Sequence, residues 1–420
     1  MAAHRPDEHR SPPVTALPPP GPHLLLDATL PDGTRADLRI ADGRIAAITP
    51  VPAGRERVAP GAGEAALDGA LLLPALVDGH AHLDKTFLGA PWQPHRATAD
   101  LRGQIASERR LRREVAAQTP VADRAEALAR RMAALGTGFV RSHVDVDPDT
   151  GLDHLYAVLE ARERVRELLD VQLVAFPQSG VVAEPGVADL LDAALREGAE
   201  LIGGLDPFGF DNDVDGQLDV VFGLAERHGA GVDIHLHDGG GAGAAQLRAI
   251  AGRTAALGLG GKVAVSHAYC LGQLAEPELT RTASALAAAG VAVMTNGPAR
   301  TMPPVKLLHE LGVLVFAGSD NIRDAWWPYG TGDMLERATV IGLQGELMTD
   351  QELVLAAELA TGQAARALGV EEYGIAVGRP ANLVAVAAYS VPEAVAAHPG
   401  RLLVLHRGRT VLDRLDDLPQ

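Results

Sequence analysis

The sequence predicts an α/β protein: a closed (β/α)8 TIM barrel joined to a small β-sandwich domain that both chain ends build together. Three observations support this prediction. Eight apolar, strand-like segments follow one another through the middle of the chain, amphipathic helical segments separate most of them, and both ends contain short strand-like runs. Strands that alternate with helices indicate a parallel sheet, and eight such units favour closure into a barrel.

The two ends of the chain are β-rich. Their strand-like runs, bounded by turn residues, are 24–26, 36–40, 44–48, 381–386, 401–405 and 410–412. We therefore expect residues 23–73 and 376–420 to form the β-sandwich domain and residues 74–375 to form the barrel. Residues 1–22 are polar and rich in proline, and we expect them to be a disordered tail.

The middle of the chain supplies the barrel. Its eight expected strands are 71–79, 138–145, 170–177, 201–206, 231–236, 262–267, 291–295 and 312–319. The helical patterns between them include 121–135, 152–169, 187–197, 217–228, 244–257 and 277–289. The polar segment 96–118 predicts a solvated helix over the barrel mouth. An open, doubly wound sheet is the alternative, but no Gly-x-Gly-x-x-Gly motif follows the first strand.

Composition and charge limit the classes of partner and location. The chain of 420 residues has a formal net charge of −17, which argues against nucleic acid because phosphate binding needs a basic surface. No uninterrupted apolar stretch reaches the ~18 residues of a membrane span, and the N-terminal residues lack the apolar core of a secretory signal. Cys270 is the only cysteine, so no intrachain disulfide is expected. These features favour a cytoplasmic protein.

The most informative motif is His80-Ala81-His82, at the end of the first expected barrel strand. Alternate residues of a strand point to the same side, so the two imidazoles project together and can share one metal ion. Barrel active sites lie at the C-terminal ends of the strands. The other candidate side chains at such ends are Gln178, His235, His237, His267 and Asp320. We expect His143 and Asp145, on the second strand, to be hydrogen-bonded inside the barrel.

Three neutral imidazoles and one carboxylate form a ligand set suited to Zn²⁺ or Fe²⁺. Such a metal lowers the pKa of a bound water from ~15.7 towards ~7 and supplies hydroxide at neutral pH. Asp320 would bind the metal, take the water proton, or do both. His267 would polarise a substrate group or stabilise a tetrahedral intermediate.

Several segments of the chain resemble the amidohydrolase superfamily and, within it, the cytosine deaminase branch. These segments are 77–86, 141–146, 174–178, 233–235, 265–267, 319–320, 326–331 and 378–383. The motif His-x-His-Leu-Asp-Lys-Thr, at 80–86, is specific to this branch. The resemblance covers nearly all of the chain beyond the N-terminal tail.

The resemblance implies a role for each candidate residue. One divalent metal ion, zinc or iron, would be held by His80, His82, His235 and Asp320. His267 would assist attack on a ring carbon, and Gln178 would read the amide edge of a cyclic substrate. Asn321 and Trp326 would also contact the substrate, while Lys85 either contacts it or forms a structural ion pair. Relatives are often oligomeric, so a homo-oligomer is compatible with the resemblance.

Three residues distinguish this chain from cytosine deaminases. Asp238 stands where the branch has a glutamate that carries protons to the leaving ammonia, and Asn321 replaces the second of two aspartates. His237 resembles the N-isopropylammelide amidohydrolases, relatives that release an alkylamine from a triazine ring. We expect Asp238 or His237 to protonate the leaving amine.

Together these residues predict a metal-dependent aminohydrolase that cleaves an exocyclic C–N bond of a nitrogen heterocycle, as cytosine deaminases do. One alternative is hydrolysis of an N-alkylamino triazine or a cyclic amide at the same site. A second is a barrel that only binds a heterocycle or a metal. A third, a phosphate-dependent barrel enzyme, would need a glycine-rich phosphate loop after the seventh or eighth strand, and the sequence offers little support for one.

Overall fold

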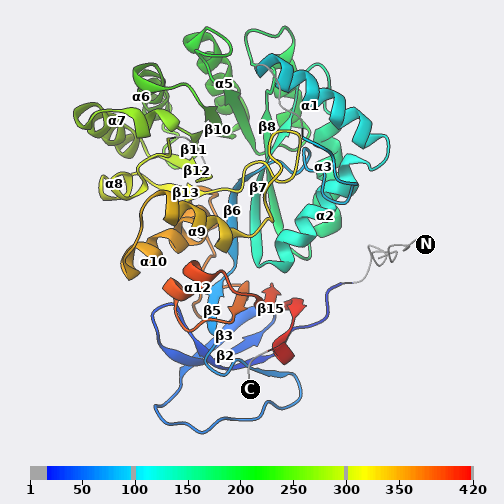
Figure 1. Cartoon of the computed structure of the whole chain (residues 1–420), viewed down its shortest axis with the longest axis vertical. Coiled ribbons are helices and arrows are strands. Elements are labelled where there is room, and N and C mark those ends of the chain that lie inside the picture. Colours follow the sequence, from blue (N-terminus) through cyan, green and yellow to red (C-terminus); the bar gives the residue numbers. More distant parts are fainter. Residues whose placement is uncertain (1–16, 96–100, 298–300, 418–420) are drawn as a thin grey trace.

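The barrel is built from eight parallel strands (Figure 1). The computed structural model of the chain describes residues 17–95, 101–297 and 301–417. The strands are β6 (Leu76–Ala81), β7 (Thr137–Asp145), β8 (Asp170–Phe176), β9 (Leu201–Leu205), β10 (Gly231–Leu236), β11 (Val263–His267), β12 (Val291–Thr295) and β13 (Val315–Ala317). They pair in chain order, and a parallel bridge between Ala81 and Asp320 brings the last strand back to the first. The predicted barrel is confirmed.

Helices cover the outside of the barrel. They are α2 (Val121–Ala134), α3 (Asp153–Val165), α4 (Val187–Arg196), α5 (Val214–His228), α6 (Gly240–Ala256), α7 (Glu276–Ala289), α8 (Val305–Glu310), α9 (Met334–Gln344), α10 (Asp350–Leu359) and α11 (Gly362–Ala367). Helix α5 illustrates how the sequence sets their limits. The Asp213 side chain accepts a hydrogen bond from Gly216 N at its start, and Gly229 takes the left-handed conformation at its end, with φ of 65°.

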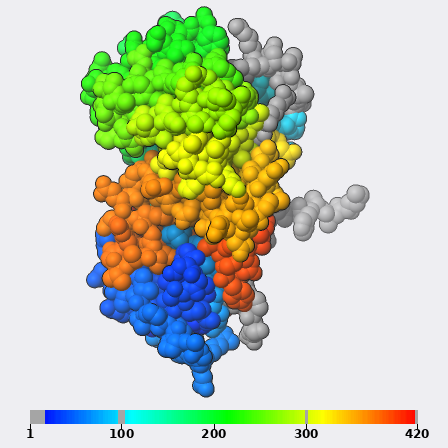
Figure 2. Space-filling view, turned by 90° about the vertical axis from the view of Figure 1, so that its left-hand side faces the viewer, coloured from blue at the N-terminus to red at the C-terminus, as the bar shows by residue number. Residues whose placement is uncertain are grey.

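The two chain ends form a second, mixed sheet at one end of the molecule, where the blue strands lie beside the orange and red strands in Figure 1. Its strands are β1 (Leu24–Thr29), β2 (Arg35–Ala41), β3 (Arg44–Pro50), β4 (Glu64–Ala66), β5 (Leu71–Pro74), β14 (Leu383–Val386), β15 (Arg401–His406) and β16 (Arg409–Asp413). A separate apolar core, with Leu38, Leu72 and Leu383, lies within this part. Figure 2 shows the first residues that the structure describes, in blue, at the opposite end of the molecule from the green barrel residues. Helix α12 (Val391–Ala397) precedes β15.

Two expected boundaries are wrong in detail. The apolar run 71–79 is two strands, because β5 pairs with β14 in the mixed sheet and the chain enters the barrel only at β6. The expected tail also ends earlier than residue 22. Thr410 N donates to Pro19 O and Gly21 N donates to Gly408 O, so this stretch lies along the start of β16. Residues 1–16 lie outside the described residues.

Helix α1 (Leu101–Ala116) lies in the connection after β6, within the segment expected to be a solvated helix. One of its faces is buried, with Glu108 3% and Arg112 6% exposed. The expectation of a fully solvated helix is therefore wrong. Polar sequence alone did not reveal this burial, because Glu108 and Arg112 pair with each other and Arg112 pairs with the buried Asp145 of β7.

Candidate active site

Three barrel strands bring four potential metal ligands together. His80 lies in β6 with His82 directly after it, His235 lies in β10, and Asp320 follows β13. The His82 Nε2 atom lies 3.3 Å from His80 Nε2 and 3.4 Å from His235 Nε2. Asp320 Oδ1 lies 3.4 Å from His82 Nε2 and 3.5 Å from His80 Nε2. The structure thus brings together the four ligands that were predicted from their positions at strand ends.

The spacing of these donor atoms fits one metal ion. Ligand atoms about 2.0–2.2 Å from a tetrahedral centre are about 3.3–3.6 Å apart, which matches the measured separations. Burial lowers the pKa of both His82 and His235, which keeps the imidazoles neutral as ligation requires. The Nδ1 atoms of both rings find no hydrogen-bond partner among the described residues. These four residues could therefore hold one divalent cation.

A buried hydrogen-bond chain fixes the orientation of His80. The Ser266 hydroxyl donates to Asp233 Oδ1 at 2.7 Å and lies 2.8 Å from His80 Nδ1. A hydroxyl that donates its single proton to a carboxylate must accept from the imidazole. His80 therefore carries its proton on Nδ1 and directs the Nε2 lone pair towards His82 and Asp320. Arg141 Nη1 donates to the other oxygen of Asp233, Oδ2, at 2.9 Å.

Replacing Ser266 with alanine is expected to weaken divalent-metal binding about 10–100-fold, because loss of an outer partner frees the ligand ring to change tautomer and orientation. Competition with a chromogenic chelator measures the affinity. Ser284→Ala, on the exposed side of α7, is the matched control and should bind metal as the wild type does. Equal metal affinity in the Ser266→Ala and Ser284→Ala variants would contradict the orienting role.

A second polar group lies beside the histidine cluster. His237 Nδ1 is 2.8 Å from Asp206 Oδ2, and its ring stacks on that of His267 with centroids 4.5 Å apart. Partial burial opposes the charged form of His237, but the hydrogen bond and charge of Asp206 outweigh it and raise the His237 pKa. Asp206 was not among the sequence candidates. Asp206 directly follows β9, and an acidic residue at that strand end could have been selected from the sequence.

Asp238 does not take part in this group. Its carboxylate accepts hydrogen bonds from Gly209 N and Gln246 Nε2, both at 2.9 Å, and it does not line the cavity. The expectation of a catalytic Asp238 is therefore not supported by its position. The chain turns into α6 directly after Asp238, and this turn directs the side chain away from His237.

Lys85 and Gln178 lie together on another wall of the cavity. Lys85 Nζ donates to Gln178 Oε1 at 2.5 Å and lies 3.0 Å from Asp145 Oδ1. Both alternatives for Lys85 therefore hold in part, since it forms a buried ion pair and also lines the cavity. Because Gln178 Oε1 accepts from a cation, the Gln178 amide can present its N–H donors to a bound ring.

The loop after β13 brings Asn321 and Trp326 to the cavity. Asn321 Nδ2 donates to Asp324 Oδ2 at 2.5 Å, so the Asn321 oxygen is the acceptor available to a ligand. Asp324 Oδ1 also accepts from the backbone N–H groups of Trp326 and Trp327. Asp324 thus fixes both expected substrate contacts of this loop.

Replacing Asp324 with asparagine is expected to reduce the loss of stability that the wild type shows as the pH rises. Burial raises the pKa of Asp324 from 3.8 to about 7, although the nearby Lys85 charge opposes this. The folded chain therefore keeps a proton that the unfolded chain releases. The protonated Asp324 carboxyl makes its full contribution to the unfolding free energy below pH 4. This contribution is lost as the pH rises to 7, at about 1.4 kcal/mol per pH unit.

Urea unfolding at pH 5 and pH 8 measures this difference for the wild type, Asp324→Asn and the exposed control Asp219→Asn. The change in unfolding free energy between the two pH values should be smaller in Asp324→Asn than in the other two proteins. The same change in all three would contradict the assignment.

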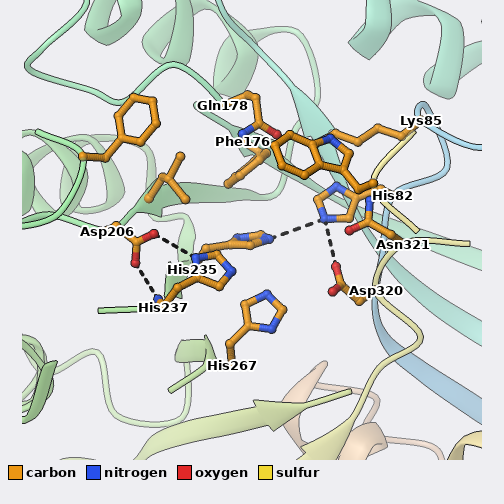
Figure 3. A pocket seen from close by; sticks show the side chains of 13 residues that line it. His82, Lys85, Phe176, Gln178, Asp206, His235, His237, His267, Asp320 and Asn321 are labelled. Atoms are coloured by element: carbon orange, nitrogen blue, oxygen red, sulfur yellow. Dashed lines mark hydrogen bonds and ion pairs between the residues drawn. The ribbon is translucent and has the colours of Figure 1, made fainter. Parts of the chain in front are cut away.

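The cavity that these residues enclose has a volume of about 300 Å³. Figure 3 shows His82 and His235 in its centre, with Asp206 and His237 to one side and Lys85 and Asn321 to the other. Its apolar lining consists of Phe176, Leu205, Phe210 and Trp326. A flat ring could therefore lie over the histidine cluster with polar groups at both edges.

The other two expectations for the strand ends have mixed outcomes. His143 is buried and stacks on His80 with centroids 3.9 Å apart, but neither ring nitrogen has a hydrogen-bond partner among the described residues. His143 is therefore an interior residue, as expected, but its Nε2 lies 3.6 Å from Asp233 Oδ2 and is not hydrogen-bonded to it. Asp145 pairs with Lys85 and Arg112 inside the protein, as expected of an interior residue.

In the described parts of the chain, no helix is both long and apolar enough to cross a bilayer.

Comparison with known proteins identifies the family. The Amidohydrolase family profile matches residues 64–412. N-isopropylammelide isopropyl amidohydrolase of Pseudomonas sp. (strain ADP) is 34% identical over 359 residues, which are 82% of this chain and 86% of that protein.

Two solved structures extend the comparison. The crystal structure of N-isopropylammelide isopropylaminohydrolase from Burkholderia multivorans is 42% identical with a TM-score of 0.85, covering 92% of this chain and 97% of that one. The 5-methylcytosine deaminase from Klebsiella pneumoniae, liganded with 5-fluorocytosine, is 27% identical with a TM-score of 0.83, covering 93% and 97% of the two chains. The resemblance seen in the motifs is confirmed: this chain belongs to the amidohydrolase family and is a hydrolase of carbon–nitrogen bonds other than peptide bonds.

Proposed function

We propose that this enzyme hydrolyses the exocyclic C–N bond of an oxygenated nitrogen heterocycle and releases an alkylamine. The observation that carries this proposal is the Asp206–His237 pair, placed in a cavity with apolar walls, while Asp238 is turned away. The similarity of this chain to two N-isopropylammelide hydrolases supports an N-alkylamino heterocycle as the substrate.

The proposal includes one divalent metal ion, zinc or iron, at the cluster of His80, His82, His235 and Asp320. A bound ion of this type would act as a Lewis acid and lower the pKa of water. Asp320 turns one oxygen to the histidines, while its other oxygen accepts from Asn296 Nδ2 at 2.8 Å. That carboxylate is placed to accept the water proton beside the cluster. His267 lies next to it and is placed to polarise the attacked ring carbon.

His237 is the proposed proton donor to the leaving amine. Its Nδ1 is held by Asp206, which fixes the ring and stabilises the imidazolium form. The Nε2 N–H of that form would then donate to the amine nitrogen as the C–N bond breaks. An alkylamine is a poor leaving group without this proton, so the donor is essential to the reaction.

The residues on the opposite wall of the cavity are placed to bind the ring. The Lys85 ammonium and the Gln178 N–H donors suit ring carbonyl oxygens, and the Asn321 oxygen suits a ring N–H. Trp326 also lines the cavity and would contact the ring. These groups favour an oxo-substituted ring such as ammelide over an apolar arene.

Product analysis on metal-loaded protein tests the proposal. One substrate set holds N-alkylamino triazines with ring oxygens, and the other holds cytosine-like amino heterocycles. Alkylamine from the first set supports the proposal. Ammonia from the second set alone would replace it with ring deamination, and ring opening in either set would replace it with cyclic-amide hydrolysis. Binding without any product would leave a heterocycle-binding barrel.

A further inference from the structure

Helix α1 joins the loops that surround the cavity, although it does not line the cavity itself. Arg112 Nη1 donates to Asp145 Oδ2, at the end of β7, over 2.6 Å. Arg109 Nη2 donates to Ser179 Oγ, after β8, over 2.8 Å. Gln104 Nε2 donates to Ala325 O, after β13, over 2.8 Å. The helix therefore contacts the ends of three strands, and the loops after two of them, β8 and β13, carry ring-recognising residues.

One of these contacts continues to the cavity as an unbroken chain. Arg112 pairs with Asp145 Oδ2, Asp145 Oδ1 lies 3.0 Å from Lys85 Nζ, and Lys85 donates to Gln178 at 2.5 Å. The side chains of Arg112, Asp145 and Lys85 are 7%, 0% and 3% exposed. The chain thus runs through protein interior, where charged hydrogen bonds are strong and an unpaired charge is costly.

The charges in this chain show what Arg112 contributes. Asp145 has two oxygens: Oδ2 accepts a hydrogen bond from Arg112, and Oδ1 forms an ion pair with Lys85. Glu108, one turn before Arg112, lies 3.4 Å from the same guanidinium and adds a second buried carboxyl. Without the guanidinium, Lys85 would be the remaining cation in contact with Asp145. Its three N–H donors would turn to both carboxylate oxygens and away from Gln178.

We propose that Arg112 is a positioning residue of the substrate pocket, which acts through Asp145 to keep Lys85 and Gln178 directed at the ring. This inference rests on the proposed function, because it assigns the Lys85–Gln178 wall to ring recognition. Arg112 touches neither the substrate nor the histidine cluster. Its loss should therefore weaken ring binding and raise KM, with little change in kcat.

The test uses the full-length, metal-loaded protein and cyanuric acid, the ring product that remains after amine release from an N-alkylammelide. Calorimetry measures its Kd, and amine release gives kcat and KM. Arg112→Gln is expected to weaken binding about tenfold, the effect of one charged hydrogen bond. Arg110→Gln is the matched control, because Arg110 lies on the same helix with an exposed side chain, and it should match the wild type. Arg112→Lys, which keeps the charge, should lie between them.

A double-mutant cycle separates positioning from general destabilisation. Arg112→Gln and Gln178→Ala change residues that do not touch each other, so their losses in binding should add if Arg112 only supports the fold. If Arg112 acts on Gln178, the double variant should lose clearly less than the sum. Additive losses, or equal Kd values for Arg112→Gln and Arg110→Gln, would overturn the inference while the wild type still hydrolyses its substrate. If Arg112→Gln does not fold, the same cycle with Arg112→Lys decides. A wild type that neither binds cyanuric acid nor releases amine would overturn both proposals.

Discussion

Replacing Asp320 with alanine is expected to reduce turnover by at least about 10⁴-fold, the loss typical of removing one member of a catalytic group that acts as a unit. Asp320 is the only carboxylate in the four-residue ligand cluster of the described residues, and its Oδ1 lies within 3.5 Å of two imidazole nitrogens. Without it, the site loses both a ligand and the group placed to accept the water proton. Amine release, metal content and melting temperature should be measured on the same preparation.

Asp215→Ala is the matched control for this variant. The Asp215 side chain is 89% exposed on α5 and pairs only with Arg253 among the described residues. It should retain full turnover and metal content. The Asp320→Ala variant should remain folded, because its site is at the open end of the barrel and the apolar cores are untouched. Turnover near the wild-type rate in Asp320→Ala would exclude the proposed use of the cluster.

Much of this site could be predicted because, in a barrel, residues at the ends of separate strands lie close together in space. The C-terminal ends of parallel strands meet at one face, so His80, His235 and Asp320 were expected together although they are far apart in sequence. The structure places them within hydrogen-bonding distance of His82 or of each other. No knowledge of side-chain packing was needed for that step.

The features that could not be predicted depend on direction and on partners. Asp206 and Asp238 both follow barrel strands as acidic residues, but the chain path after β9 and β10 directs only Asp206 to His237. Residues 71–77 are apolar throughout, and only the pairing partners of the two halves of the expected strand 71–79 show that it belongs to two sheets. The buried face of α1 was hidden because its charges look solvated until their partners are known.

Replacing His237 with glutamine is expected to lower kcat about 10²–10⁴-fold on an N-alkylamino substrate, the usual contribution of a general acid. Glutamine retains hydrogen-bonding groups but cannot carry the proton that an alkylamine needs in order to leave. Cyanuric acid binding should change little, since Lys85 and Gln178 lie on the opposite wall. Asp206→Asn should lower kcat in the same direction, because the imidazolium form loses its charged partner.

The leaving group decides whether His237 donates a proton or only shapes the site. A substrate with the same ring and a p-nitrophenoxy group in place of the alkylamine expels a stable anion that needs no proton. On this substrate the loss caused by His237→Gln should shrink to less than about tenfold, because the contribution of a general acid falls as the leaving group becomes less basic. His228→Gln removes a similar histidine–aspartate pair, to Asp192 at 2.8 Å, and should leave both rates unchanged. If His237→Gln slows both substrates equally, proton donation must come from another group, and the stacking of His237 on His267 becomes its remaining contribution.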